Sequence, residues 1–427
     1  MDTTVNSTTP IAITHLGLCT PLGQSPQTAL DNLVAGSTDG MQWRDDLLFE
    51  RSVLVGQVPF ELPQIPSALA QFDTRNNQLT MLIAQQIQPA VEQAKKHYGS
   101  QRIGIVIGTS TSGIATGESA LSELHSQGEF PRDYDYAKQE LGDTSQFLQA
   151  YLDLTGPSYT VSTACSSSAK VFASATRLLN AGVCDMVIVG GVDTLCQLTL
   201  NGFHSLESIS TGHCQPFSQN RDGINIGEGG ALFTLEKVSL DKAATEHAAI
   251  VLSGFGESSD AHHISAPHPE GRGAVEAMQA ALTMAGLQPK QIDYLNLHGT
   301  ATPKNDAMES RAVQQVFDQT LPACSSTKPL TGHTLGAAGA IEAAFCYLLL
   351  SHYNQQQYLP PQVWDNQRDP NDPSLPLVKP QTQAKLTHVM SNSFAFGGSN
   401  ASLILSRQYD FSANNQGTAQ QEINQDV

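Results

Sequence analysis

The chain has few basic residues for its length. Its 427 residues include 22 Lys and Arg against 40 Asp and Glu, which gives a formal net charge of −18. Proteins bind nucleic-acid phosphates through basic faces, so this balance argues against a nucleic-acid partner. It does not argue against an acidic protein partner, because an acidic chain can still carry a local basic patch.

The chain also lacks long apolar runs. None reaches the roughly 18 residues that a membrane-spanning helix needs. The first seven residues, MDTTVNS, have neither the basic start nor the apolar stretch of a signal peptide. We therefore expect no membrane span and a cytoplasmic location.

Patterns for disulfides and metal ions are missing as well. The seven cysteines, at positions 19, 165, 184, 196, 214, 324 and 346, form no CxxC pair. An odd number of cysteines without an export signal favours free thiols. The histidines are scattered without ligand spacing, so we expect no metal site. A hydrophobic content of 40% and 34 glycines instead suit an α/β enzyme with a large core.

Short apolar segments alternate with helical patterns, and this alternation occurs twice. Strands are predicted at 11–17, 103–107, 186–189 and 231–235, with helices at 78–93 and 169–181. The pattern then restarts, with strands at 249–256, 294–297, 388–391 and 401–405 and a helix at 273–286. Such a repeat favours a layered α/β fold built by duplication. We expect halves at 10–247 and 248–409, and a disordered polar tail at 410–427.

Cys165 lies where a predicted strand passes into a predicted helix, in the segment VSTACSSSA. At a helix N-terminus the dipole and the free N–H groups favour a thiolate over a thiol. The same position offers a backbone N–H to a developing oxyanion. An isolated cysteine is more often a buried core residue, so the interpretation depends on other segments.

Three further segments carry chemically useful groups near predicted strand ends. His298 lies in NLHGTATP, Lys328 and His333 lie in SSTKPLTGHTLGAAGA, and Gly397 and Gly398 lie in NSFAFGGSN. Active sites of α/β enzymes gather at the carboxyl ends of strands. Singly, each segment has a structural explanation as a turn cap, a solvated charge or a plain turn. Their occurrence together with Cys165 favours a catalytic site.

Together these segments resemble β-ketoacyl-acyl carrier protein synthases of the elongating Cys-His-His type. The resemblance extends over residues 10–407, and RDG at 221–223 with GEG at 227–229 is a further match. It implies a thiolase-like duplicated fold in five α-β-α-β-α layers and a homodimer. It also implies acyl carrier protein as partner and no cofactor of the chain's own, because phosphopantetheine arrives on the carrier protein. Thiolases use a second cysteine and initiating synthases an asparagine, so His333 argues against both.

The resemblance implies a role for each residue in decarboxylative condensation. Cys165 would hold the acyl chain, and the N–H groups of Cys165 and Phe396 would form the oxyanion hole. His298 and His333 would donate Nε2–H to the malonyl thioester carbonyl, and Lys328 would position this pair. Four further roles are implied: a gate at Phe396, Gly397 and Gly398; pantetheine contacts at Thr300 and Thr302; an acyl contact at Thr111; and support from Asp306 and from Glu309, the expected partner of Lys328.

Pathway and assembly stay open at this point. Fatty-acid elongation is the simplest assignment. Ala395, where relatives usually carry glycine, and the polar segment 109–113 favour a specialised pathway such as aryl polyene synthesis. The chain could alternatively be the active or accessory subunit of a heterodimeric ketosynthase–chain length factor pair, and its intact Cys165 favours the active subunit. The candidate basic contacts for carrier protein are Arg75, Lys95, Lys96, Arg102 and Arg132.

Overall fold

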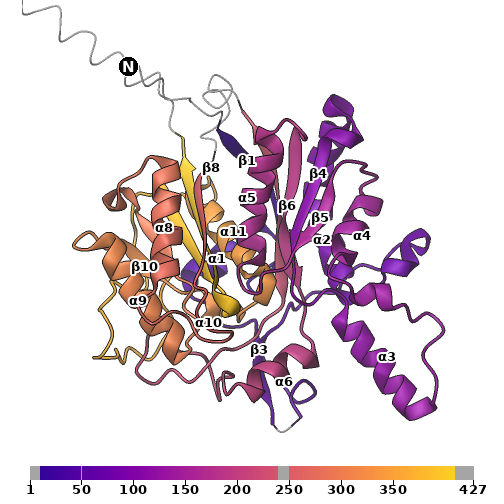
Figure 1. The fold of residues 1–427 in the computed structure, drawn as a ribbon, viewed down its shortest axis with the longest axis horizontal. Helices are drawn as coiled ribbons and strands as arrows, with labels where there is room; N and C mark the ends of the chain where they lie inside the picture. The colour runs from indigo at the N-terminus through magenta and orange to yellow at the C-terminus, as the bar shows by residue number, and fades with distance from the viewer. Residues whose placement is uncertain (1–9, 50, 239–249, 409–427) are drawn as a thin grey trace, which may run out of the picture.

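The computed structural model describes residues 10–49, 51–238 and 250–408. Ten strands form a sheet in the order β10-β9-β11-β12-β8-β1-β7-β6-β4-β5 (Figure 1). The first half contributes β1 (Ile11–Cys19), β4 (Ile103–Gly108), β5 (Ser158–Val161), β6 (Met186–Asp193) and β7 (Gly229–Lys237). The second half contributes β8 (Ile250–Ser259), β9 (Tyr294–Asn296), β10 (Ala323–Ser325), β11 (His388–Phe394) and β12 (Ser399–Arg407). A separate hairpin pairs β2 (Met41–Arg44) with β3 (Val53–Gly56).

The two halves have the same topology. If the strands of each half are numbered along the chain, both halves read 3-2-4-5-1 from the outer edge to the centre. In each half the second strand pairs parallel with the third and fourth, and the remaining pairs are antiparallel. The halves meet where β1 pairs with β8. The predicted duplication is therefore confirmed, whereas the predicted boundary at 247/248 and the tail at 410–427 lie outside the described residues.

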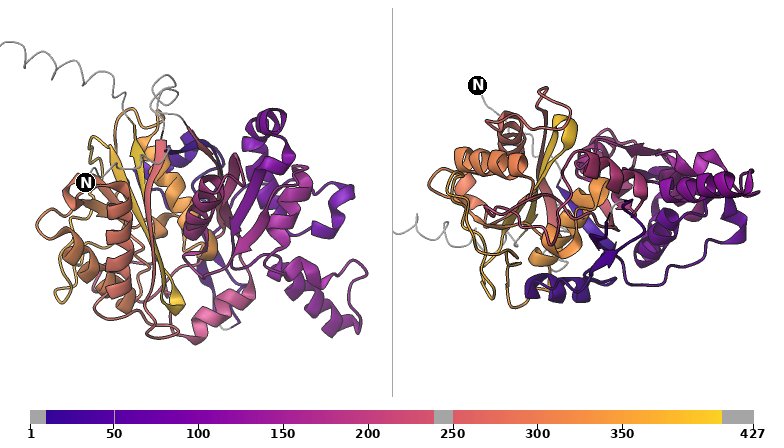
Figure 2. Two further views of the ribbon diagram at one scale, coloured as in Figure 1. Left: turned by 45° about the horizontal axis from the view of Figure 1, so that its top comes forward. Right: turned by 90° about the horizontal axis from the view of Figure 1, so that it is seen from below.

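Helices cover both outer faces and fill the space between the halves (Figures 1 and 2). Helices α2 (Arg75–Tyr98) and α4 (Asp143–Tyr151) pack outside the first half. Helices α8 (Arg272–Ala285) and α9 (Pro303–Phe317) pack outside the second half. Helices α5 (Ser167–Asn180) and α11 (Ala338–Leu350) lie between the halves and contact each other and both sets of strands. The predicted five layers are thus confirmed.

The sequence of each layer reflects its burial. Strands β4 and β6 are buried at every position, because helices cover both their faces, and both read as nearly continuous apolar runs. Helix α11 is apolar around most of its surface, as expected for a helix enclosed by other layers. At Gly339 in α11, a Cβ atom would lie 2.7 Å from the backbone nitrogen of Ala169 in α5. This glycine therefore allows the two central helices to approach closely.

Four further helices bear on the site: α1 (Pro26–Ala35), α3 (Ile114–Gln127), α6 (Gln197–Ser205) and α10 (Lys328–Thr331). Helix α3 projects from the body at the lower right of Figure 1. Edge strand β5 is the strand predicted before Cys165, whereas edge strand β10 was not assigned a range, because a run of three residues carries too little periodicity. All seven cysteines are unpaired, as predicted. No helix in the described ranges is long and apolar enough to cross a membrane.

Candidate active site

Cys165 lies in a tight turn between β5 and α5, as the sequence predicts. Strand β5 ends at Val161 and α5 begins at Ser167. Ala164 adopts a left-handed conformation with φ of 53°, which few non-glycine residues do. The thiol is only 4% exposed, so the turn directs it into the protein rather than to solvent.

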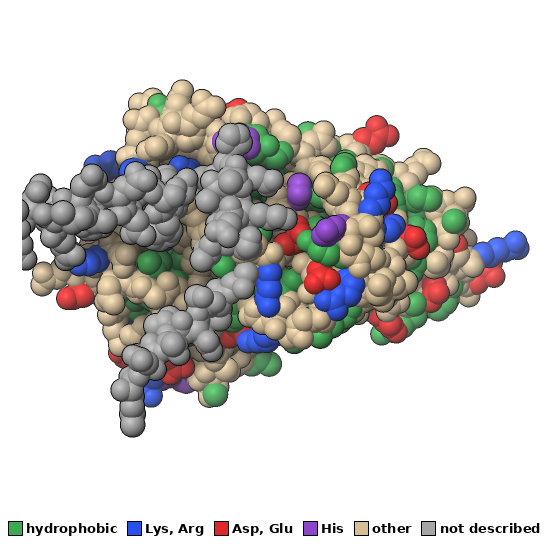
Figure 3. Space-filling view, turned by 90° about the horizontal axis from the view of Figure 1, so that it is seen from above, with side chains coloured by type: hydrophobic (Ala, Val, Ile, Leu, Met, Phe, Trp, Pro, Cys, Tyr) green, Lys and Arg blue, Asp and Glu red, His purple; other side chains and the backbone are tan. Residues whose placement is uncertain are grey.

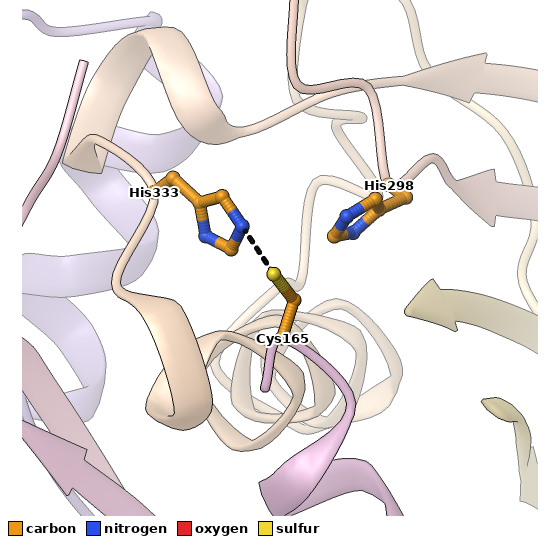
Figure 4. Close-up of side chains that lie close together, drawn as sticks. All are labelled: Cys165, His298 and His333. Carbon is orange, nitrogen blue, oxygen red and sulfur yellow. Dashed lines mark hydrogen bonds between the residues drawn. The ribbon is translucent and has the colours of Figure 1, made fainter. Parts of the chain in front are cut away.

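Two histidines from the second half lie beside this thiol (Figure 4). The Nε2 atom of His333, which follows α10, lies 3.0 Å from the Sγ atom of Cys165. The ring of His298, which follows β9, lies 5.4 Å from that of His333 at an interplanar angle of 87°. The fold therefore brings three predicted catalytic side chains from both halves into one group.

Hydrogen bonds determine the tautomer of each ring. The Leu335 N–H donates to Nδ1 of His333 at 3.2 Å, and the Lys328 ammonium, which can only donate, lies 3.4 Å from Nδ1 of His298. Burial, and then the charge of Lys328, holds the pKa of both histidines well below 6.5. Both rings are therefore neutral, and each carries its proton on Nε2.

The backbone of His333 is held by the strand-like segment 225–227. Its N–H donates to the Asn225 carbonyl at 2.7 Å, and its carbonyl accepts from the Gly227 N–H at 3.0 Å. A Cβ atom on Gly227 would lie 2.0 Å from the Thr331 carbonyl oxygen. Glycine at the first position of the GEG motif thus permits the close approach that holds His333 in place.

Lys328 forms a buried ion pair with Glu342 of α11. The Nζ–Oε1 distance is 2.5 Å, and the two side chains are 3% and 4% exposed. The expectation that Glu309 is the partner of Lys328 is therefore wrong. The sequence analysis missed Glu342. Its lone carboxylate in the apolar helix AGAIEAAFCYLLL could have indicated a buried ion pair, because buried charges are paired.

Glu309 and Asp306 instead support the turn that carries His298. Glu309 accepts hydrogen bonds from the N–H groups of His298 and Gly299, both at 2.8 Å. Asp306 accepts from the Ala301 N–H at 3.2 Å and from the Phe217 N–H at 2.8 Å. Burial raises the pKa of Glu309 to about 7 and that of Asp306 to about 6, and these N–H groups oppose the shift. Helix α9 thus supplies two acceptors for the backbone of this turn.

We expect Glu309→Ala to lower the free energy of unfolding by about 2–5 kcal/mol, because it leaves two buried N–H groups without an acceptor. Urea denaturation followed by circular dichroism measures this. The matched control is Glu276→Ala, at an exposed position of α8, with an expected change of about 0.5 kcal/mol or less. Equal stabilities of the two variants would contradict the supporting role of Glu309.

A pocket of about 240 Å³ opens beside Cys165, His298 and His333. Its lining residues are Cys165, Phe203, Ile224, His298, Thr300, Thr302, Asn305, His333, Phe394 and Phe396. The predicted pantetheine contacts Thr300 and Thr302 thus line it, with their hydroxyl oxygens 2.9 Å apart. Phe203, Ile224 and Asn305 were not predicted, because they lie outside the motifs, and Phe394 lies inside one without an assigned role.

The same group is the one cluster in the described ranges whose ligand atoms are close enough for a metal ion, all within 4.8 Å of one another. The Lys328 ammonium lies beside His298 and would repel a cation there. The arrangement therefore suits a nucleophile with two neutral hydrogen-bond donors better than a metal centre.

Both halves match known family models. Residues 8–240 match the beta-ketoacyl synthase N-terminal domain, and residues 249–363 match the beta-ketoacyl synthase C-terminal domain. This chain belongs to the beta-ketoacyl synthase family. The resemblance inferred from the motifs is therefore confirmed, and with it the thiolase-like duplicated fold.

Relatives match this beta-ketoacyl synthase over nearly its whole length. A 3-oxoacyl-[acyl-carrier-protein] synthase 2 of Coxiella burnetii is 32% identical, covering 94% of this chain and 99% of that protein. Among solved structures, a chain in the complex of the ketosynthase ApeO with its chain length factor ApeC from Xenorhabdus doucetiae is 44% identical, with a TM-score of 0.86 over 94% of this chain and 98% of that chain. A beta-ketoacyl synthase from Burkholderia phymatum is 29% identical, with a TM-score of 0.80 over 94% and 100% of the two chains.

Burial favours the protonated thiol of Cys165, the predicted nucleophile of this beta-ketoacyl synthase. Burial raises the pKa of Cys165 to about 11, against the opposing effects of the Phe396 N–H, the Lys328 charge and the Cys165 N–H. The expectation that the helix N-terminus favours a thiolate is therefore wrong, because loss of solvent outweighs those effects. The two N–H groups are the predicted oxyanion donors, and both lower the pKa of this thiol.

Alkylation of Cys165 by iodoacetamide should consequently become about tenfold faster with each pH unit between pH 7 and pH 9, because only the thiolate reacts. Peptide mass mapping over time measures the rate at this residue alone. In urea-unfolded protein, the rate should level off above about pH 8.5, the pKa of a free thiol. A rate in the folded synthase that is already constant at pH 7 would contradict a raised pKa.

The predicted gate of the synthase lies over the pocket. The Phe396 ring lies 5.4 Å from that of Phe203, and Gly397 and Gly398 adopt φ of 81° and 75°, which favour glycine. Ala395 has φ of −91° and ψ of 152°, extended values that any residue adopts. The alanine therefore introduces no backbone strain in this conformation, and movement of the gate stays a prediction.

Thr111 lies outside the pocket lining of the synthase. Its hydroxyl donates to the buried carboxylate of Asp193 at 2.8 Å, and Thr109 donates to the same oxygen at 2.6 Å. The other oxygen of Asp193 accepts from the Ala337 N–H at 2.9 Å. The structure thus assigns the Thr111 hydroxyl to this hydrogen-bond network, and a contact with substrate stays a prediction.

Proposed function

We propose that this chain catalyses the decarboxylative Claisen condensation of an acyl group on Cys165 with malonyl-acyl carrier protein. The product is a 3-oxoacyl-acyl carrier protein two carbons longer. The observation that carries the proposal is the placement of a thiol 3.0 Å from the Nε2–H of His333, with His298 beside both. A nucleophile and two neutral donors in one buried pocket serve both halves of this reaction.

In the first half, Cys165 attacks the carbonyl carbon of an acyl thioester. The Sγ–carbon bond forms, the carbon–sulfur bond to pantetheine breaks, and the thiol proton of Cys165 ends on the leaving pantetheine sulfur. The N–H groups of Cys165 and Phe396, which lower the pKa of the thiol at rest, would stabilise the oxyanion. Free carrier protein then leaves, and the acyl group stays on the enzyme.

In the second half, malonyl-carrier protein enters and loses carbon dioxide. The electron pair of the broken carbon–carbon bond passes into an enolate, whose oxygen accepts the Nε2–H groups of His298 and His333. The enolate carbon attacks the acyl carbonyl, the Cys165 sulfur leaves, and a proton restores the thiol. Neutral rings with Nε2–H support this role, because they donate wherever negative charge develops.

The chain needs no cofactor of its own in this proposal, because the carrier protein supplies phosphopantetheine. Thr300 and Thr302 line the pocket, and their hydroxyls can bond the pantetheine amides. Of the basic residues considered for carrier contact, Arg75 pairs with Glu228 and Arg102 pairs with Asp185. In the face shown in Figure 3, basic and acidic side chains are intermixed.

Intact mass after incubation with acyl-carrier proteins tests the proposal. The panel contains saturated medium-chain donors and polyene donors. Equal loading of saturated chains would assign fatty-acid elongation, and a preference for polyenes would assign a specialised pathway such as aryl polyene synthesis. A folded protein that forms no adduct with any donor would overturn the condensing function.

We propose further that this chain works as the catalytic subunit of a dimer that pairs through strand β5. An edge strand presents unpaired backbone groups to a partner, and Tyr159 of β5 is 38% exposed. Sequence resemblance favours a second copy. Two similar structures, the ApeO–ApeC complex and the ishigamide ketosynthase/chain length factor, favour a chain length factor. Native mass of the purified chain distinguishes them: twice the chain mass supports the homodimer, and a monomer that dimerises only with a co-expressed factor supports the pair.

A further inference from the structure

Helix α6 presents the pocket residue Phe203 to the gate but has few anchors in the core. Phe203 lines the pocket, and its ring packs against that of Phe396. Within α6 only Leu200 is buried. Leu198 is 61% exposed and Leu206, just after the helix, is 52% exposed. Phe203 is partly buried and packs against the apolar cluster that contains Leu200 and Ile224. The polar contacts of α6 add to this packing and set the orientation of the helix.

The N-terminus of α6 is capped by a residue from another helix. Its own N-cap residue, Cys196, makes no side-chain cap hydrogen bond. Glu118 of α3 takes that place: its two carboxylate oxygens accept from the N–H groups of Gln197 at 2.9 Å and Leu198 at 2.6 Å. A carboxylate at this position satisfies unpaired N–H groups and interacts favourably with the helix dipole.

Further polar contacts hold α6 from a different side. Asn201 donates to the Leu47 carbonyl at 3.0 Å, and the Gln197 side chain donates to the Asp46 carbonyl at 2.8 Å. Both partners belong to the segment between β2 and β3. Glu118 thus links α6 to α3, and removing it leaves the N–H groups of Gln197 and Leu198 without this acceptor and loosens the first turn of the helix that carries Phe203.

We propose that Glu118 is a positioning residue that sets Phe203 against the Phe396 gate and so controls the entry of longer acyl chains. The inference rests on the proposed acyl loading of Cys165. An acetyl group needs only the space next to the thiol, whereas a longer chain also occupies the pocket beside Phe203. Displacing Phe203 therefore affects long chains more than short ones.

Rates of Cys165 acylation with two donors test the proposal. We expect Glu118→Ala to slow loading from an eight-carbon acyl-carrier protein about tenfold, and from acetyl-carrier protein about twofold or less. The matched control is Glu123→Ala on the same helix, because no hydrogen bond to the Glu123 carboxylate occurs in the described part of the chain; it should leave both rates unchanged. Glu118→Gln keeps one acceptor oxygen, so its rate of loading from the eight-carbon donor should lie between those of Glu118→Ala and wild type. This variant tests the proposal if the alanine variant does not fold.

A double-mutant cycle with Phe203→Ala shows whether Glu118 acts through this ring. In the Phe203→Ala background, Glu118→Ala should cause no further change in the ratio of long-chain to short-chain loading. The positioning role would be overturned if Glu118→Ala slowed loading equally for both chain lengths. It would also be overturned if the effects of Glu118→Ala and Phe203→Ala on the loading ratio were fully additive. Wild type that loads neither donor would overturn the proposed function itself, so the two failures are distinguishable.

Discussion

The Cys165→Ala protein should form no acyl adduct and should lose at least about 10⁴-fold in condensation rate, because removal of a covalent nucleophile leaves only binding and oxyanion stabilisation. Intact mass with an acyl-carrier protein detects the adduct, and mass analysis of the 3-oxoacyl product gives the rate. The adduct on wild type should map to the peptide that contains Cys165.

A second buried cysteine provides the control for that experiment. Cys184 is 2% exposed and lies in a core cluster that both halves form, outside the pocket lining, so Cys184→Ala changes a thiol of similar burial away from the pocket. It should load as wild type does. An adduct that persists in Cys165→Ala, or that disappears in Cys184→Ala, would assign the nucleophile to another residue.

His298→Ala should separate the two half-reactions. Malonyl decarboxylation should fall about 10²–10³-fold, because one of the two Nε2–H donors to the enolate is lost. Acyl loading of Cys165 should continue, since the neighbouring His333 and the N–H groups of Cys165 and Phe396 are unchanged. Release of labelled carbon dioxide measures the first step, and intact mass measures the second.

We expect the His298→Ala protein to fold, because the substitution leaves no buried charge without a partner. Lys328 retains its ion pair with Glu342, so no buried charge is left unpaired. His388→Ala, at a half-buried histidine that contacts Ser406 in the sheet, is the control for loss of an imidazole elsewhere. A folded His298→Ala protein that loses both half-reactions would contradict the division of labour proposed here.

Most of the fold could be predicted from local patterns. Strands buried on both faces, such as β4 and β6, read as continuous apolar runs, and the helical periodicity of α2 and α5 is visible over several turns. Edge strand β10 escaped prediction because it has only three residues. The sequence around Glu342 does not show which basic residue it pairs with. The partner of Lys328 is therefore decided by the tertiary structure, which brings Glu342 of α11, and not the expected Glu309, to the Lys328 ammonium.

The sequence by itself determined the family, the nucleophile and the two histidines, because each sits in a local motif whose residue types the chemistry requires. Only the tertiary structure decided how these groups are charged and held. Burial by segments from both halves raises the pKa of Cys165, and contacts from distant segments select the Nε2–H tautomers. Likewise, Glu118 reaches α6 across 79 and 80 positions of the chain. Desolvation and long-range hydrogen bonds depend on which segments pack together, and that information is not contained in any single local pattern.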